Sequence, residues 1–211
     1  MGKENGLAPH IVLGEQALTI EQIWAIAAQP GQAKLSEAPE VLARLARSAR
    51  FVEDLLARDG VIYGVTTGYG DSCTVDVPPE AIADLPLHLT RFHGCGMGQM
   101  LSPAQTRAVM AVRLAALLQG WSGVSPELVR LLGEMLTRDI LPLIPAEGSV
   151  GASGDLTPLS YIAGALVGER DVLVQGQVLR ASLALAQAGL QPLRLRPKEA
   201  LALMNGTAVM T

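Results

Sequence analysis

Along most of this chain, apolar positions recur every three or four residues, which is the period of one face of an α-helix. The clearest case begins near Pro39, in the stretch PEVLARLARSARFVEDLLARDG, and Gly60 gives it a natural C-terminal stop. The apolar residues on one face of this stretch are Leu42, Leu45, Ala49, Val52 and Leu56. We therefore predict an amphipathic helix here.

Three hydroxyl residues mark the starts of other helices. Thr19 and Ser102 are each followed three residues later by a glutamine, Gln22 and Gln105, so both positions match a capping box. Ser125 repeats the Ser-Pro opening found at Ser102, and proline is favoured at the first helical position. We expect a helix after each, the first stopped by a Pro-Gly pair and the second by a glycine.

Strand spacing is confined to two short segments. A β-like run, HIVLG, precedes the first helix, and DVLVQGQVLR alternates Val and Leu around Gln175-Gly176, which is typical of a small hairpin rather than a sheet. The residues after the hairpin show a helix, a proline-rich connector and a second helix. The pattern therefore predicts a mainly α fold with a small β-hairpin element.

Two glycine-rich loops interrupt the helices and are candidates for function. The first is VIYGVTTGYGDSCTVDVPP, and the second begins at RFHGCGMG, where three glycines in five residues make a continued helix improbable. A third stretch, GSVGASGDLTPLSY, runs from small residues directly into an apolar helix. Loops of this kind carry binding and catalytic groups more often than the helices between them.

The composition indicates a globular chain with more apolar residues than the core of a monomer of this size needs. With 211 residues the chain is long enough to bury a core, and 49% of them are hydrophobic while 17% are charged. Mean hydropathy is +0.32, so we expect the chain to bury surface against other chains. Aromatic residues make up only 3%, which favours packing of helix on helix through Ala, Leu, Val and Ile.

Charge, cysteine spacing and the distribution of apolar residues limit the kinds of partner and location that we expect. Sixteen basic and twenty acidic residues give a net charge of -4 without a basic cluster, which argues against nucleic acid and favours a small-molecule partner. Cys73 and Cys95 match no ligand spacing, and His88 and His93 do not form a metal pair, so we assign no metal. The first ten residues lack the apolar core of a signal peptide, and no apolar run could span a bilayer. We expect a soluble, cytoplasmic protein.

Two familiar interpretations of GSVGASGDLTPLSY fail on residue type. A phosphate-binding P-loop needs Lys and then Ser or Thr after its last glycine, but Gly154 is followed by Asp155, whose charge repels phosphate. A nucleophile elbow of the form G-x-S-x-G would match Gly151 and Ser153, but it requires glycine at position 155. Neither phosphate binding nor a serine hydrolase is therefore predicted.

A third interpretation is a cyclisation of the backbone that needs each residue of the tripeptide Ala152-Ser153-Gly154. In a compressed loop the amide nitrogen of Gly154 can attack the carbonyl carbon of Ala152, and glycine leaves that approach least hindered. Loss of one water closes a five-membered ring, and loss of a second from Ser153 leaves an exocyclic methylidene, which is an electrophile. A helix starting near Asp155, with Pro158 in its first turn, would direct its positive end at the ring, with Asp155 as its cap. The alternative is an ordinary glycine-rich loop ahead of a capped helix.

Four stretches resemble motifs of one family. GSVGASGDLTPLSYIAG resembles the signature of the aromatic amino-acid ammonia-lyases, which form 4-methylidene-imidazol-5-one from Ala-Ser-Gly. YGVTTGYG resembles the family's tyrosine loop, RFHGCGMG its substrate-selectivity segment, and MNGT its Asn-Gly-Thr element, all in family order. The resemblance implies a helical ammonia-lyase-like fold and the same cofactor, made from Ala152, Ser153 and Gly154.

The resemblance also implies roles for single residues. Tyr63 would be the general base that removes the β-proton of the substrate. Asn205 would bind near the cofactor and the substrate carboxylate, and Phe92 with His93 would tune selectivity for the ring. His93 is similar to the histidine-specific members and GSVG leans the same way, whereas Phe92, PLSYIAG and NGTA are more similar to the phenylalanine and tyrosine branch. The substrate therefore stays an aromatic amino acid without further assignment.

The resemblance covers only the N-terminal portion of such an enzyme. Family members are roughly twice this length or more, and their C-terminal part supplies a helical bundle, further catalytic tyrosines and an arginine for the substrate carboxylate. Family active sites are shared within homotetramers, so residues 1–211 would form an N-terminal domain with an incomplete pocket, and its last residues look cut off. The implied activity is ammonia elimination to the α,β-unsaturated acid. The alternatives are a 2,3-aminomutase and a non-catalytic helical fragment.

Overall fold

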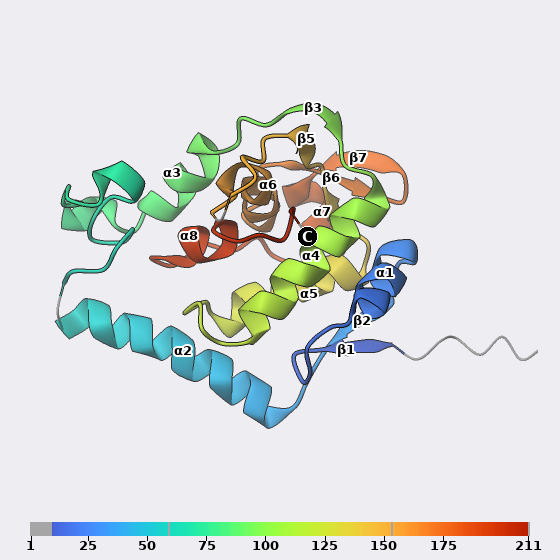
Figure 1. Ribbon diagram of the computed structural model, residues 1–211, viewed down its shortest axis with the longest axis horizontal. Coiled ribbons are helices and arrows are strands. Elements are labelled where there is room, and N and C mark those ends of the chain that lie inside the picture. Colours follow the sequence, from blue (N-terminus) through green and yellow to red (C-terminus); the bar gives the residue numbers. More distant parts are fainter. Residues whose placement is uncertain (1–9, 59, 153, 211) are drawn as a thin grey trace, which may run out of the picture.

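Helix α6 (Leu156–Leu166) lies inside the upper part of the molecule as drawn in Figure 1. Every residue from Pro158 to Leu166 is buried, as expected for a helix that is apolar on all sides. The computed structural model describes residues 10–58, 60–152 and 154–210. The predictions for Ser153 and for the N-terminal stretch up to Pro9 lie outside the described residues.

Helices make up most of the ordered elements, which confirms the mainly α fold. Besides α6, the helices are α1 (Ile20–Ala28), α2 (Pro39–Arg58), α3 (Leu85–Phe92), α4 (Pro103–Leu118), α5 (Pro126–Thr137), α7 (Ala181–Gln187) and α8 (Glu199–Met204), with short 3₁₀ turns at Gly70–Ser72 and Pro79–Ala81. Helices α3, α5, α7 and α8 pack against α6, and α1 packs against α4. Helices α4 and α5 supply much of the core, through residues such as Met110, Leu114 and Leu132, which are fully buried.

The predicted helix starts are confirmed in detail. Thr19 and Ser102 each accept a hydrogen bond from the backbone of the glutamine three residues on, and each glutamine side chain accepts one from the cap residue in return. The Ser125 side chain accepts from the amide of Leu128. These caps form from neighbours in the sequence, so they can be predicted without knowledge of the fold.

Helix α2 has the predicted extent, but the apolar face is shifted. Val41, Leu45 and Ala49 are buried, whereas Leu42, which we placed on the apolar face, is 48% exposed. Residues 41, 45 and 49 form one row spaced four apart, and only a single row is buried because α2 lies at the edge of the molecule (Figure 1). The placement of Leu42 on the buried face was therefore wrong.

The β structure is larger than the predicted hairpin. Strands β6 (Asp171–Val174) and β7 (Gln177–Arg180) form that hairpin, with positive φ at Gln175 and Gly176. Strand β4 (Leu141–Pro142) pairs with β6 and makes a three-stranded sheet. Two more pairs are β1 (Ile11–Leu13) with β2 (Ala33–Leu35), parallel, and β3 (Met97–Met100) with β5 (Pro145–Glu147), antiparallel. The loop predicted at RFHGCGMG thus becomes a strand from Met97.

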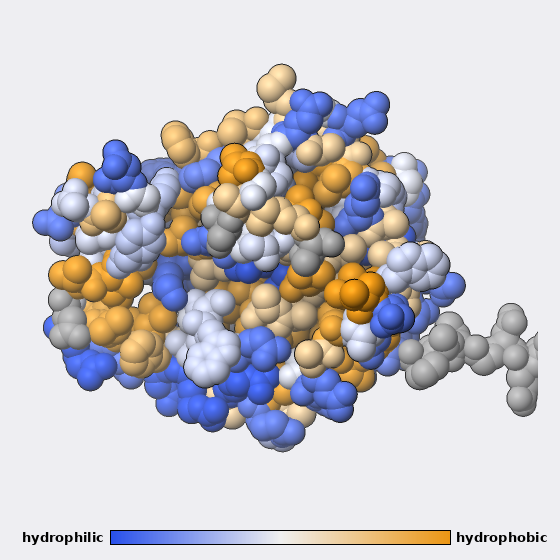
Figure 2. All heavy atoms as spheres, in the orientation of Figure 1, coloured by the Kyte–Doolittle hydropathy of each residue, from blue (hydrophilic) through white to orange (hydrophobic). Residues whose placement is uncertain are grey.

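Several large apolar side chains reach the surface. Trp121 is 88% exposed, Trp24 73% and Ile20 81%, and Figure 2 shows apolar residues, in orange, among hydrophilic ones on one face. No helix in the part of the chain that the structure describes is long and apolar enough to cross a membrane.

Candidate functional site

The loop between β5 and the start of α6 is shaped by glycines. Gly151 has φ +65° and Gly154 has φ +86°, in the left-handed region where side chains with a Cβ are strained. A Cβ on Gly148 would lie 2.7 Å from Cγ2 of Thr157 in the first turn of α6. The small residues noted in the sequence therefore allow the loop to fold closely over the N-terminal end of α6.

Asp155 occupies the N-cap position of α6, but its carboxylate does not cap the helix. Oδ1 instead accepts a hydrogen bond from the backbone amide of Val150 at 3.2 Å, across the loop. The residue is 1% exposed, and Oδ2 is buried without a hydrogen-bond partner among the described residues. The predicted cap was therefore wrong: the side chain closes the loop on itself, which a local sequence rule does not reveal.

Asn205 lies directly against Gly154. A Cβ placed on Gly154 would be 2.8 Å from Oδ1 of Asn205, so only a glycine allows this approach. The next residue, Gly206, accepts a hydrogen bond from the amide of Asp155 through its carbonyl at 3.3 Å. Asn205 is the C-cap of α8. Two successive residues at the end of this short helix, Asn205 and Gly206, therefore contact the candidate cofactor loop.

A buried arginine on α4, which none of the four sequence motifs includes, lies behind this contact. Arg113 Nε donates to the carbonyl of Leu203 at 2.7 Å, and Nη2 donates to the carbonyls of Ala202 and Asn205. The side chain is 6% exposed, and burial lowers the pKa of its guanidinium to about 10. An arginine inside the apolar stretch AVMAVRLAALL was the available signal.

Tyr63 lies in a turn that packs on α8. Its hydroxyl oxygen accepts a hydrogen bond from the amide of Gly70 at 2.7 Å, and the residue is 53% exposed. Gly64 has φ +69°, and a Cβ there would overlap the side chain of Leu201. No hydrogen bond among the described residues joins Tyr63 to the loop before α6.

Phe92 and His93 end helix α3. His93 Nδ1 lies 3.0 Å from the carbonyl oxygen of Leu89, which can only accept, so Nδ1 carries the proton and Nε2 is left for another partner. The His93 ring centroid is 5.9 Å from that of Tyr69, whose pKa is raised by burial, and 5.1 Å from that of Phe92. Phe92 is 76% exposed, so one side of this pair is open.

Two arginines hold the end of α3 near α6. Arg91 Nε donates to Glu169 Oε2 at 2.9 Å, and Nη2 donates to Oε1. This hydrogen bonding lowers the pKa of the Glu169 carboxyl, because Arg91 favours its charged form. The guanidinium of Arg170 lies over the ring of Tyr161 in α6, 4.8 Å from the centroid, and its Nη2 donates to the carbonyl of Gly94, just after α3, at 3.5 Å. Residues at the end of α3 are therefore fixed relative to the helix that follows the loop.

The four segments singled out in the sequence meet one another in the structure. The tyrosine loop contacts α3 through Tyr69 and His93, and a Cβ on Gly148 would lie 3.4 Å from Cα of Gly96. The contact of Asn205 with Gly154 joins the fourth segment, MNGT, to the loop before α6. Gly154 and Asn205 are thus brought together, whereas among the described residues the Tyr63 hydroxyl makes its hydrogen bond with Gly70 and none with this loop.

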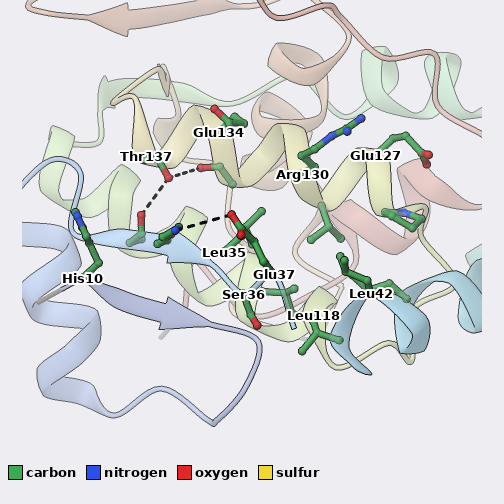
Figure 3. Close-up of a pocket in the computed structure, with 17 residues that line it drawn as sticks. His10, Leu35, Ser36, Glu37, Leu42, Leu118, Glu127, Arg130, Glu134 and Thr137 are labelled. Carbon is green, nitrogen blue, oxygen red and sulfur yellow. Dashed lines mark hydrogen bonds and ion pairs between the residues drawn. The ribbon is translucent and has the colours of Figure 1, made fainter. Parts of the chain in front are cut away.

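Two other kinds of site do not coincide with these residues. A cavity of about 510 Å³ lies between β2, α2 and α5, where Figure 3 shows Leu35, Leu42 and Thr137, but none of the predicted site residues lines it. Within the described ranges no group of three His, Cys, Asp or Glu residues could hold a metal ion. Cys73 and Cys95 are free and exposed.

Comparisons with known proteins agree on one family. The family model described as aromatic amino acid lyase matches residues 18–211. Histidine ammonia-lyase from Chloroflexus aurantiacus is 44% identical over 201 residues, covering 95% of this chain and 38% of that protein. Histidine ammonia-lyase from Gloeobacter violaceus is 42% identical over 205 residues, covering 97% of this chain and 40% of that protein.

A solved structure gives the same result for the fold. The crystal structure of tyrosine aminomutase from Streptomyces globisporus superposes with a TM-score of 0.87 at 35% identity, covering 96% of this chain and 38% of that one. The chain therefore spans about two fifths of the length of the proteins it matches.

Proposed function

Since the chain belongs to the aromatic amino acid lyase family, we propose that it is the N-terminal part of an aromatic amino-acid ammonia-lyase. In this proposal residues 1–211 form the domain that carries the cofactor-forming loop. The reaction would be elimination of ammonia to give the α,β-unsaturated acid. A C-terminal helical bundle, on the same or another chain, would complete the pocket, and the assembly would be a homotetramer.

The contact of Gly154 with Asn205 is the observation that carries the proposal. Ala152, Ser153 and Gly154 would cyclise to 4-methylidene-imidazol-5-one, and the surroundings fit such a group. Gly154 has the left-handed φ that glycine tolerates, and Oδ1 of Asn205 lies only 2.8 Å from the place that a Cβ on Gly154 would occupy. The Asp155 carboxylate holds the loop closed through the amide of Val150. When formed, the group supplies an electrophile that ordinary side chains lack.

The remaining residues would bind and orient the substrate. Asn205, at the C-cap of α8, presents its side-chain amide beside Gly154 and would hydrogen-bond near the substrate carboxylate. His93 has its Nδ1 committed to Leu89, which leaves Nε2 to contact a polar ring, and Phe92 offers an apolar face. Tyr63 would remove the β-proton through its phenolic oxygen, which already accepts from Gly70.

Mass spectrometry of one peptide tests the proposal. Trypsin should release residues 139–170, since no Lys or Arg lies between Arg138 and Arg170. We expect this peptide to be lighter than its encoded mass by two waters. The Ser153→Ala variant lacks the hydroxyl that the second loss requires, so its peptide should lose one water at most. An unmodified peptide, both in this chain and after co-expression with the C-terminal part of a relative, would mean that the chain is a non-catalytic fragment.

A second candidate activity is supported by the structural comparison. The tyrosine aminomutase from Streptomyces globisporus matches the fold with a TM-score of 0.87, so a 2,3-aminomutase is the alternative. It would return the amine to the β-carbon instead of releasing it. Chromatography of the products separates the two, because only an aminomutase yields a β-amino acid. Parallel assays with histidine, phenylalanine and tyrosine would identify the substrate.

A further inference from the structure

We propose that Arg113 is a positioning residue for the site, because it holds Asn205 and Gly206 against the loop at Gly154 and Asp155. The inference rests on the proposed function, because the loop at Gly154 matters only if it forms the cofactor. The contacts of Arg113 can be tested whether or not the cofactor forms. Arg113 lies on α4, outside all four segments that the sequence singled out.

The guanidinium acts on the C-terminal end of α8. It donates to the carbonyls of residues 202 and 203, in the last turn of the helix, and of Asn205, its C-cap. Carbonyls in the last turn of a helix have no partner within it. A cation at a helix C-terminus is also favoured by the helix dipole. Because α8 has only six residues, it gains little stability from its own hydrogen bonds, and its end depends on such outside contacts.

The fixed end of α8 is the surface that the loop contacts. Gly206 lies directly on the guanidinium, since a Cβ at this position would overlap Nη1 of Arg113. The carbonyl of the same Gly206 accepts from the amide of Asp155, and the side chain of Asn205 lies against Gly154. One layer of backbone, Asn205-Gly206, thus separates Arg113 from the loop.

Arg113 makes no ion pair that would explain its burial. No carboxylate among the described residues lies within salt-bridge distance of it. Desolvating a cation is costly unless its hydrogen bonds are made, so its three carbonyl contacts must offset that cost. The guanidinium is therefore committed to the backbone of residues 202–205.

Arg107 on the same helix provides a matched control. It is 7% exposed, donates to the carbonyl of Ala27 and pairs with Asp139 at 2.9 Å. Like Arg113 it is a buried arginine that ties α4 to another segment, but none of its partners belongs to the loop or to α8. Replacing it should destabilise the protein without a specific effect on the site.

Hydrogen exchange on the full chain tests the positioning role. In Arg113→Met we expect the amides of the α8 end and of Asp155 to exchange about tenfold faster or more, since hydrogen bonds to a charged group are lost. Arg107→Met should leave both segments near the wild-type rate, and Arg113→Lys should fall between. If Arg113→Met does not fold, Arg113→Lys is compared with Arg107→Lys instead. Equal exchange of the Asp155 amide in the two matched variants overturns the proposal.

The cyclised fraction of the tryptic peptide gives a second readout. If wild type shows the two-water loss, Arg113→Met should lower the cyclised fraction several-fold while Arg107→Met retains it, and equal fractions would count against the role. If wild type is not cyclised, the proposed cofactor fails, but the exchange comparison still decides whether Arg113 positions the loop. The two proposals therefore fail separately.

Discussion

At the scale of single residues, the hydroxyl of Tyr63 can be tested on its own. Its one described polar contact is with the exposed amide of Gly70, which can turn to water instead, so Tyr63→Phe should change the free energy of unfolding by less than about 0.5 kcal/mol. If the phenol is the general base, turnover of the assembled enzyme should fall by about 10²- to 10⁴-fold. Thermal unfolding and a steady-state assay measure the two effects.

Tyr161→Phe is the control for that substitution. The ring of Tyr161 is buried under Arg170, and its hydroxyl makes only a long contact of 3.5 Å with the carbonyl of Gly96. We expect it to retain turnover and stability. A Tyr63→Phe enzyme as active as Tyr161→Phe would rule out the general-base role.

Residue chemistry decides which site residues the sequence reveals. Gly154 and Asn205 were found because their types are needed in a recognisable motif, and the structure places them in contact. The carboxylate of Asp155 turned to Val150 rather than to the helix, because a buried side chain follows the fold of the whole loop. Arg113 was missed since its partners lie about 90 positions away and are backbone carbonyls, which carry no sequence signal.

At the scale of elements, the turn that carries Tyr63 depends on its contact with α8. Gly64 combines a positive φ of +69° with a close approach to Leu201, so Gly64→Ala meets both backbone strain and a steric overlap. We expect a loss of about 2–4 kcal/mol in the free energy of unfolding, from about 1 kcal/mol of strain and the rest from overpacking. Chemical denaturation measures it.

Gly60→Ala separates these two causes. Gly60 has nearly the same φ, +66°, but nothing lies within 4 Å of a Cβ there, so only the strain of about 1 kcal/mol should remain. Similar losses in the two variants would show that packing of the tyrosine loop on α8 contributes little. A larger loss in Gly64→Ala supports the contact that links two of the four segments.

Helices were predicted better than strands for a physical reason. The capping boxes at Thr19 and Ser102 form within four residues, so the sequence contains all of their partners. The pairing of β3 with β5 joins Met97 to Glu147, and neither strand has enough alternation to stand out alone. The hairpin of β6 and β7 was found because its turn is local, but β4, its third strand, was not.

At the scale of the whole molecule, exposed apolar surface should be covered by further protein. Beside Trp121 a hollow of about 590 Å³ is lined by Phe51, Val52 and Leu55, and Phe51 is 61% exposed. Arg44, Arg47 and Lys198 also line the hollow, and exposed apolar side chains with polar residues at their rim mark an interaction surface more often than a solvated one. The excess of hydrophobic residues in the composition agrees with this, and so does a chain that spans about two fifths of its relatives.

We predict that this surface is buried when the proposed C-terminal part is supplied. Adding the C-terminal part of a histidine ammonia-lyase relative should shift the emission of Trp121 to shorter wavelength, because this side chain is 88% exposed in the chain alone. Trp121→Ser should weaken the association about tenfold or more, as expected for a large aromatic at an interface. Val178→Ser, an exposed apolar residue on the β6–β7 hairpin, is the control and should have little effect. Sedimentation measures the affinity. An emission that stays unshifted while the two parts sediment together would place the interface elsewhere and leave the surface around Trp121 without this role.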